Sequence, residues 1–305
     1  MSELLNGGLP FVGSEAQNLG VSPAKLRTLV SSRHVRRVLR GVYVDARTPD
    51  SRALRACALQ LIRPPGAIFY GATVAFLLGV DAFPPRERFN FLPQCVVPHH
   101  SGRCTRRLVR CREGYLPDED LIELDGLVVT IPLRTTVDLL RSLWRPHALA
   151  AADAMAHSGH VTREEVLAYI APMRRYPGII QARALARLID DKAESPGESW
   201  QRLRLIDAGF PIPKSQFTAF DNAGFPVARL DHAYPEKRVG MEYDGREFHS
   251  DDVAKDSDDS KREYLTDILR WRLAIGKYEN IFGEDPAFER QVGEWIGMEP
   301  GPRLW

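Results

Sequence analysis

The feature that most constrains this chain is a strand-like stretch, residues 239–244, that carries two carboxylates. Apolar side chains alternate in it with small or acidic ones, which is the two-residue period of a strand with one apolar and one polar face. Glu242 and Asp244 therefore point the same way. A second strand, residues 225–231, ends on Asp231, and a hairpin-like connection would place this carboxylate beside Glu242. The sequence thus predicts two paired strands with clustered acidic groups.

Carboxylates at the mouth of a small sheet suit a hard divalent cation, because Mg2+ takes oxygen ligands and keeps several waters for a substrate phosphate. We therefore predict a site for Mg2+, or Mn2+, with Asp231, Glu242 and Asp244 as the metal ligands. Asp244 followed by Gly245 has an ordinary alternative interpretation as a turn, since Asp-Gly is a strong turn signal. His249 follows shortly afterwards and is either a proton-transfer group or an exposed loop residue.

A further carboxylate belongs to a predicted helix upstream of these strands. Ser195 is the expected N-cap, Pro196 occupies the first turn, and Glu198 completes a capping box. Capping is the ordinary role for Glu198, but a carboxylate in the first turn of a helix can also lean over a neighbouring sheet. The elements after residue 193 follow the order helix, strand, strand, helix, strand, helix, which describes a small α/β sandwich.

The N-terminal region has the pattern of a winged helix. Ser14 is predicted to cap a short helix, Ser22-Pro23 opens a second one, and a Gly-containing turn joins them. The β-branched and basic stretch over residues 35–44 fits a β-hairpin wing. We expect the second helix to enter a DNA major groove and the wing to reach flanking phosphates, although a basic face can also be merely solvated. The residues predicted to bind DNA are Lys25, Arg27, Arg33, Arg36, Arg37 and Arg40.

Length and charge set the broad frame of the molecule. A chain of 305 residues predicts two or three domains, here a winged helix over 1–48, a mixed α+β region over 49–192 and an α/β domain over 193–305. The expected fold class is therefore multidomain, α+β and α/β. The formal net charge is only +1, so the case for nucleic acid depends on the local basic cluster. No signal-peptide pattern or long apolar run occurs, so a cytoplasmic protein without a membrane partner is expected.

The middle region shows no constellation of catalytic residues, and its predicted role is architectural. An arginine-rich segment in it forms either a further phosphate-facing strip or a polar strand face. Its members are Arg103, Arg106, Arg107, Arg110 and Arg112. The cysteines have no C-x-x-C spacing and are expected to be reduced, although a zinc site is an alternative whose spacings match no common pattern. Its ligands would come from Cys95, His99, His100, Cys104 and Cys111.

The C-terminal motifs resemble the Vsr-like branch of the PD-(D/E)XK endonuclease superfamily. These motifs are Ser-Pro-Gly-Glu-Ser from residue 195, Arg-Leu-Asp-His from residue 229, Met-Glu-Tyr-Asp-Gly from residue 241, and His249. The resemblance implies a restriction-endonuclease-like α/β domain with Asp231 as the central metal ligand. The catalytic residues that it implies are Glu198, Asp231, Glu242, Asp244 and His249. Where the superfamily has Glu-x-Lys, this chain has Glu242-Tyr243-Asp244, so the lysine that aids water activation is missing from its usual position.

Residues 19–46 and 127–139 resemble AbiEi-type antitoxins and transcriptional regulators. The two resemblances together imply a Mg2+-dependent DNA endonuclease that hydrolyses phosphodiester bonds and carries an N-terminal DNA-binding winged helix. The alternative is a non-catalytic DNA-binding regulator or antitoxin of a type IV toxin–antitoxin-like system, with a degenerate nuclease domain and a toxin or operon partner that the sequence does not identify. The Glu-x-Asp motif favours this alternative, whereas the retained carboxylates and His249 favour the enzyme. RNA processing is a third interpretation, because metal-assisted cleavage does not distinguish the sugar.

Overall fold

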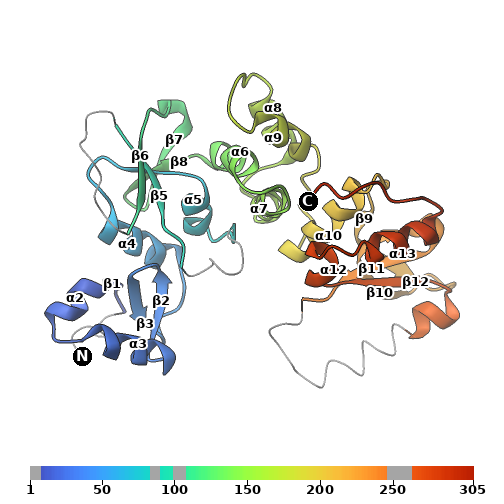
Figure 1. Cartoon of the computed structure of the whole chain (residues 1–305), viewed down its shortest axis with the longest axis horizontal. Helices are drawn as coiled ribbons and strands as arrows, with labels where there is room; N and C mark the ends of the chain where they lie inside the picture. Colours follow the sequence, from blue (N-terminus) through green and yellow to red (C-terminus); the bar gives the residue numbers. More distant parts are fainter. Residues whose placement is uncertain (1–7, 83–89, 99–107, 246–262) are drawn as a thin grey trace. The chain divides into compact units, whose positions relative to one another are not determined.

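The computed structural model describes residues 8–82, 90–98, 108–245 and 263–305. The chain divides into two compact units (Figure 1). Unit 1 comprises residues 1–143 and 160–183, and unit 2 comprises residues 144–159 and 184–305. Helices and three sheets occur among the described residues, which confirms the mixed α and β class. The boundary predicted near residue 192 lies inside unit 2.

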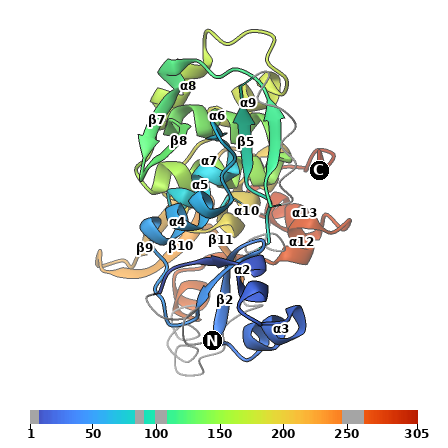
Figure 2. The same ribbon diagram turned by 90° about the vertical axis from the view of Figure 1, so that its left-hand side faces the viewer.

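The N-terminal part of unit 1, drawn in blue, combines two short helices with a small sheet (Figure 2). The sheet is antiparallel and has the order β1-β3-β2. Its elements are β1 (Phe11–Val12), α2 (Gly13–Asn18), α3 (Pro23–Ser31), β2 (Val35–Leu39) and β3 (Val42–Asp45). Helix α3 begins where the sequence predicts, since Ser22 Oγ accepts the N–H of Lys25 at 3.2 Å. Helix α2 begins at Gly13 instead of after Ser14, because the carboxylate of Glu15 accepts the N–H of Val12 at 2.9 Å.

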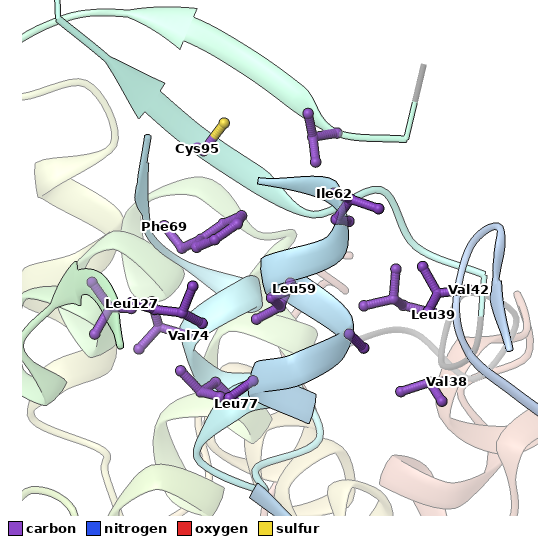
Figure 3. Packing of buried hydrophobic residues seen from close by; sticks show 14 of the residues in the cluster. Val38, Leu39, Val42, Leu59, Ile62, Phe69, Val74, Leu77, Cys95 and Leu127 are labelled. Atoms are coloured by element: carbon purple, nitrogen blue, oxygen red, sulfur yellow. The ribbon is translucent and has the colours of Figure 1, made fainter. Parts of the chain in front are cut away.

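The middle of unit 1 is a five-stranded sheet of order β6-β5-β4-β8-β7 that packs on helix α4 (Arg52–Ile62). The strands are β4 (Ile68–Phe69), β5 (Gln94–Val97), β6 (Arg110–Glu113), β7 (Leu121–Leu124) and β8 (Leu127–Thr130). Phe69 and Cys95 of the sheet, Leu59 of α4, and Leu39 and Val42 of the β2–β3 hairpin share one buried cluster (Figure 3). Full burial of such an apolar side chain contributes roughly 1.5–3 kcal/mol, so this core holds the hairpin to the sheet.

Four more helices accompany the sheet of unit 1: α5 (Ala72–Leu77), α6 (Pro132–Ser142), α8 (Arg163–Ile170) and α9 (Ile179–Ala186), the last of which runs into unit 2. The capping box predicted for α8 is confirmed, because Thr162 Oγ1 accepts the N–H of Glu165 at 3.2 Å and the Glu165 carboxylate accepts the N–H of Thr162 at 2.7 Å. Throughout the described ranges, no helix has the length and apolar character needed to span a bilayer.

Unit 2 is built around a four-stranded mixed sheet of order β12-β11-β10-β9. The strands are β9 (Lys214–Phe220), β10 (Pro226–Tyr234), β11 (Val239–Tyr243) and β12 (Arg272–Gly276). β10 runs antiparallel to both β9 and β11, and β12 runs parallel to β11. The helices of the unit are α7 (Arg145–His157), α10 (Pro196–Asp207), the π-helical turn η3 (Tyr264–Ile268), α12 (Tyr278–Phe282) and α13 (Ala287–Ile296). The predicted order of elements is present, with β9 as an additional strand that the sequence did not indicate.

Candidate functional site

Two of the predicted metal ligands lie side by side in unit 2. In the antiparallel β10–β11 pair His232 is opposite Met241, so the next position along the ladder places Asp231 beside Glu242. Asp231 Oδ2 accepts the backbone N–H of Tyr243 at 2.8 Å, which fixes this carboxylate against β11. Side chains of directly opposed residues point to the same face, with Cβ atoms about 5 Å apart. Asp231 and Glu242 therefore share one face of the sheet, which we call the acidic face.

The charges around Asp231 agree with this arrangement. The pKa of Asp231 is raised to about 6, first by burial and then by the nearby carboxylates of Glu198 and Glu242, against the lowering effect of the Tyr243 N–H. Like charges that are close together in a partly desolvated site disfavour joint ionisation. Three of the predicted site residues thus interact electrostatically, and Asp231 retains its proton into the weakly acidic range.

Glu198 belongs to the first turn of α10, is 7 % exposed, and lies close enough to Asp231 to raise its pKa. Ser195 caps the helix as predicted, with its Oγ accepting the Glu198 N–H at 3.2 Å. The reciprocal half of the predicted capping box is absent here, because Glu198 Oε2 accepts the N–H of Glu194 at 3.0 Å and the side-chain amide of Gln216 at 2.8 Å. Since Gln216 belongs to β9, the Glu198 carboxylate leans over the sheet.

Gln216 is a member of this site that sequence reasoning missed. The β9–β10 register places Phe217 opposite Leu230, so the preceding residue, Gln216, lies beside Asp231. Its amide donates to Glu198 and so connects the sheet to α10. Gln216 could have been identified from the sequence only if residues 214–220 had been recognised as a strand that pairs with β10.

The remaining donor atoms limit what a cation could use at the acidic face. One oxygen of Asp231 and one of Glu198 already accept N–H groups. Within the part of the chain that the structure describes, no three His, Cys, Asp or Glu side chains have the arrangement of a metal site. The N–H of Asp244 donates to Gly276 O at 2.8 Å, which continues the β11–β12 pairing past the end of β11. His249 lies outside the described residues, and the metal role of Asp231, Glu242 and Asp244 stays a prediction.

A buried ionic network lies on the opposite side of β10 from Asp231. Arg202 of α10 is 2 % exposed, donates to Asp153 of α7 at 2.8 Å, and lies 3.8 Å from Asp190. His232 is fully buried beside it, and its pKa is lowered to about 3, mainly by burial and then by the charge of Arg202. A buried guanidinium needs its partners, because an uncompensated interior charge is strongly destabilising. This network joins α7 to α10 and explains why α7 belongs to unit 2.

Four basic residues of the N-terminal part of unit 1 are exposed. Lys25 and Arg27 lie on α3 and are exposed. Arg33 follows the helix in a left-handed conformation with φ of 58°, and Arg40 occupies the turn of the β2–β3 hairpin; both are exposed. Leu26 is buried and packs the helix against the sheet. We call Lys25, Arg27, Arg33 and Arg40 the basic surface.

Two of the six predicted DNA-binding residues serve the fold itself. Arg36 is half-buried and donates to the carbonyl of Thr48 at 2.9 and 3.3 Å. Arg37 donates to Asn90 Oδ1 at 3.1 Å and lies 5.9 Å from the centre of the Tyr43 ring. Their guanidinium groups connect the hairpin to neighbouring loops and are therefore already engaged within the protein.

The cysteines of the middle region differ in oxidation state. Cys57 and Cys95 are free thiols as expected, whereas Cys111 is disulfide-bonded, so the prediction of a reduced thiol is wrong at that position. Cys95 Sγ lies 3.2 Å from Cys111 Sγ across the β5–β6 pair, and burial raises the pKa of Cys95 to about 11. A protonated, buried thiol is a poor zinc ligand. The other members of the zinc alternative, His99, His100 and Cys104, lie outside the described residues.

Parts of the chain match a known protein family and two mycobacterial proteins. Residues 67–188 match the AbiEi antitoxin C-terminal domain, which confirms the AbiEi-type resemblance for the middle of the chain. The uncharacterized proteins MT2308 and Rv2248 of two Mycobacterium tuberculosis strains are each 32% identical over 235 residues, which are 77% of this chain and 79% of each relative. These matches do not bear on the Vsr-like resemblance, which stays a prediction. The chain belongs to the family of these two mycobacterial proteins, and its central region is of the AbiEi antitoxin C-terminal type.

Proposed function

We propose that this protein is a DNA-binding regulator of antitoxin type. The observation that carries the proposal is the match of residues 67–188 to the AbiEi antitoxin C-terminal domain. A regulator also needs a surface that recognises DNA, and the basic surface of unit 1 supplies one in the same chain. This function corresponds to the alternative drawn from the sequence and takes precedence over hydrolysis.

In this proposal the N-terminal part of unit 1 acts as a winged helix. Helix α3 enters the major groove and presents Lys25 and Arg27 from its N-terminal half, where recognition helices contact base edges and phosphates. The β2–β3 hairpin is the wing, and Arg40 at its turn contacts the neighbouring phosphate backbone. The formal net charge of +1 provides no long-range attraction, so binding depends on these local cations.

The proposal is tested with the full chain and two fluorescent duplexes of equal length, one from the region upstream of its own reading frame and one of unrelated sequence. We expect tighter binding of the first duplex. Lys25→Ala with Arg27→Ala should weaken binding to both duplexes by roughly tenfold and lower the salt slope by about 2, since each lost phosphate contact lowers it by about 1. Arg163→Ala with Arg290→Ala, which removes two exposed arginines from α8 and α13, is the matched control. Equal binding by the parent and the Lys25/Arg27 variant would contradict the role of α3.

Metal-dependent phosphodiester hydrolysis is a second candidate, and one observation favours it. The carboxylates of Glu198 and Glu242 are close enough to raise the pKa of Asp231, as expected at a site that awaits a cation. We propose that a bound Mg2+ or Mn2+ would be held by carboxylate oxygens of Asp231 and Glu242, with Asp244 and His249 as further members of the site. The cation would supply water activation and charge neutralisation. The missing lysine of the Glu-x-Lys motif weighs against turnover, which is why regulation is preferred.

Supercoiled DNA and a structured RNA, each incubated with the full chain and Mg2+ or Mn2+, test this second candidate. Hydrolysis should be lost completely in Asp231→Ala, because the cation would carry both nucleophile activation and charge stabilisation. Cation binding is followed separately by calorimetry on the parent and on Asp231→Ala. Cleavage that persists in the variant would contradict the assignment of the site, and a parent that neither binds the cation nor cleaves either substrate would remove this candidate.

A further inference from the structure

We infer that the wing of unit 1 continues into a second phosphate-binding surface on strand β6, formed by Arg110 and Arg112, which we call the β6 strip. This inference rests on the proposed DNA-binding function and extends it. The occupant is the phosphate backbone of the same duplex, beyond the segment contacted by α3 and the wing. The strip contributes affinity without sequence preference, because phosphate contacts carry no direct base information.

Packing holds the start of β6 against the turn of the wing. Gly41 occupies this turn with φ of 78°, and a Cβ atom there would lie 2.5 Å from Leu108 Cδ2, so the Leu108 side chain fills the space beside the glycine. Val109 is 7 % exposed and belongs to the same core cluster as Leu39 and Val42 of the hairpin. Strand β6 starts at Arg110, one residue after Val109. The packing of Leu108 beside Gly41 therefore brings the start of β6 to the hairpin turn that carries the exposed Arg40.

The two arginines of the strip project from one face of β6. They are two residues apart on a strand, opposite Gln94 and Val96 of β5, and both are exposed. The Arg112 guanidinium lies 4.8 Å from the centre of the Tyr70 ring. Stacking on an aromatic ring orients the guanidinium plane and leaves its N–H edges accessible to an anion. Glu113, the acid of this strand, alternates to the opposite face and does not lie between the two cations.

The spacing of the strip suits an extended phosphate backbone. At a rise of about 3.3 Å per residue, Arg110 and Arg112 lie roughly 7 and 13 Å along the strand from Leu108. At 3.4 Å per base pair, this corresponds to a footprint that reaches roughly four base pairs past the wing. The strip therefore requires a duplex longer than the segment that α3 and the wing occupy.

The test compares the parent with Arg110→Ala/Arg112→Ala on a core duplex, the shortest that the parent binds, and on the same duplex extended by about one helical turn, roughly 10 bp, at each end. On the extended duplex the variant should bind roughly five- to tenfold more weakly, and its slope of log K against log salt should be smaller by about 2. On the core duplex the two proteins should differ by less than about twofold. Arg110→Lys/Arg112→Lys should keep the parental slope, and Arg163→Ala/Arg290→Ala controls for the loss of two charges.

Each outcome of this test is decisive. Equal salt slopes for the parent and the Arg110/Arg112 variant on the extended duplex would overturn the β6 strip and leave the proposed function standing. A parent that binds no duplex would overturn the proposed function and the strip together. Arg110→Gln/Arg112→Gln, which keeps much of the side-chain volume, replaces the alanine variant if thermal unfolding shows that removal of the Tyr70 contact destabilises unit 1.

Discussion

The basic surface of unit 1 and the acidic face of unit 2 hold their charges in opposite ways. Lys25, Arg27 and Arg40 are exposed and hydrated, so they cost little in folding and remain available to a polyanion. Glu198 is buried and Asp231 half-buried, both accept hydrogen bonds from the fold, and they repel one another. The cations of the basic surface are therefore accessible without any rearrangement, whereas the carboxylates near Asp231 repel one another until a proton or a cation reduces the repulsion.

The largest loss of stability is expected when the buried ion pair of unit 2 is broken. Asp153→Ala removes the buried partner of Arg202 and should lower the free energy of unfolding by about 3–5 kcal/mol, because a guanidinium is left in the interior. All five tryptophans lie in unit 2, so tryptophan fluorescence during urea unfolding reports on this unit. The exposed change Glu164→Ala should stay within about 0.5 kcal/mol. If Asp153→Ala lowers the free energy of unfolding no more than Glu164→Ala does, the buried network does not stabilise unit 2.

The carboxylates of the acidic face should cost stability at neutral pH. Asp231→Asn should stabilise unit 2 at neutral pH by about 1–2 kcal/mol, after allowance for solvent screening, because the fold raises the pKa of this carboxyl from 3.8 to about 6. A raised carboxyl pKa means that the folded state binds more protons between these two values. The parent should therefore lose stability relative to the variant as pH rises from about 4 to about 6, with a constant difference above.

Urea unfolding of the parent and Asp231→Asn across this pH range checks the prediction. His232 has a lowered pKa and acts in the opposite sense, since its stabilising contribution is lost as pH falls below the ordinary histidine range. The same histidine is present in both proteins, so the difference between them isolates Asp231. An asparagine variant less stable than the parent at neutral pH would show that the three carboxylates do not repel one another in the folded protein.

Local patterns predicted the elements that local chemistry determines. Ser22-Pro23 marks the start of α3, because a hydroxyl cap and a fixed φ act within one turn. The alternation of residues 239–244 predicted β11, and its hairpin with β10 placed Asp231 beside Glu242. The AbiEi-type character of the middle region was also accessible from the sequence and is confirmed by the family match.

Long-range partners could not be predicted in the same way. The role of Gln216 depends on Glu198, which belongs to another element, and the alternation along β9 is too weak to reveal the strand. Arg36 donates a hydrogen bond to the carbonyl of Thr48, and a count of charges along the sequence cannot reveal such a backbone partner. The assignment of α7 to unit 2 depends on the buried pairing of Asp153 with Arg202, far apart in the sequence.

The smallest expected effect tests how firmly the fold holds the basic surface in place. Ser22→Ala removes the side-chain acceptor for the Lys25 N–H and should cost about 0.5–1 kcal/mol of unit 1 stability. Amide hydrogen exchange in α3 should accelerate accordingly, while exchange in β10 and β11 of unit 2 should be unchanged. Unaltered exchange in α3 would show that packing of Leu26 alone fixes the start of the helix.

The salt dependence of duplex binding by the full chain measures the DNA-binding role of the basic surface. Fluorescence anisotropy with a duplex from the region upstream of the protein's own reading frame should give an affinity whose logarithm falls linearly with log salt. Engagement of the four cations of the basic surface predicts a slope of about −3.5, steeper if the β6 strip also binds. A parent protein that binds no duplex at low salt, or that binds with an affinity independent of salt, would show that these cations do not bind a nucleic-acid backbone.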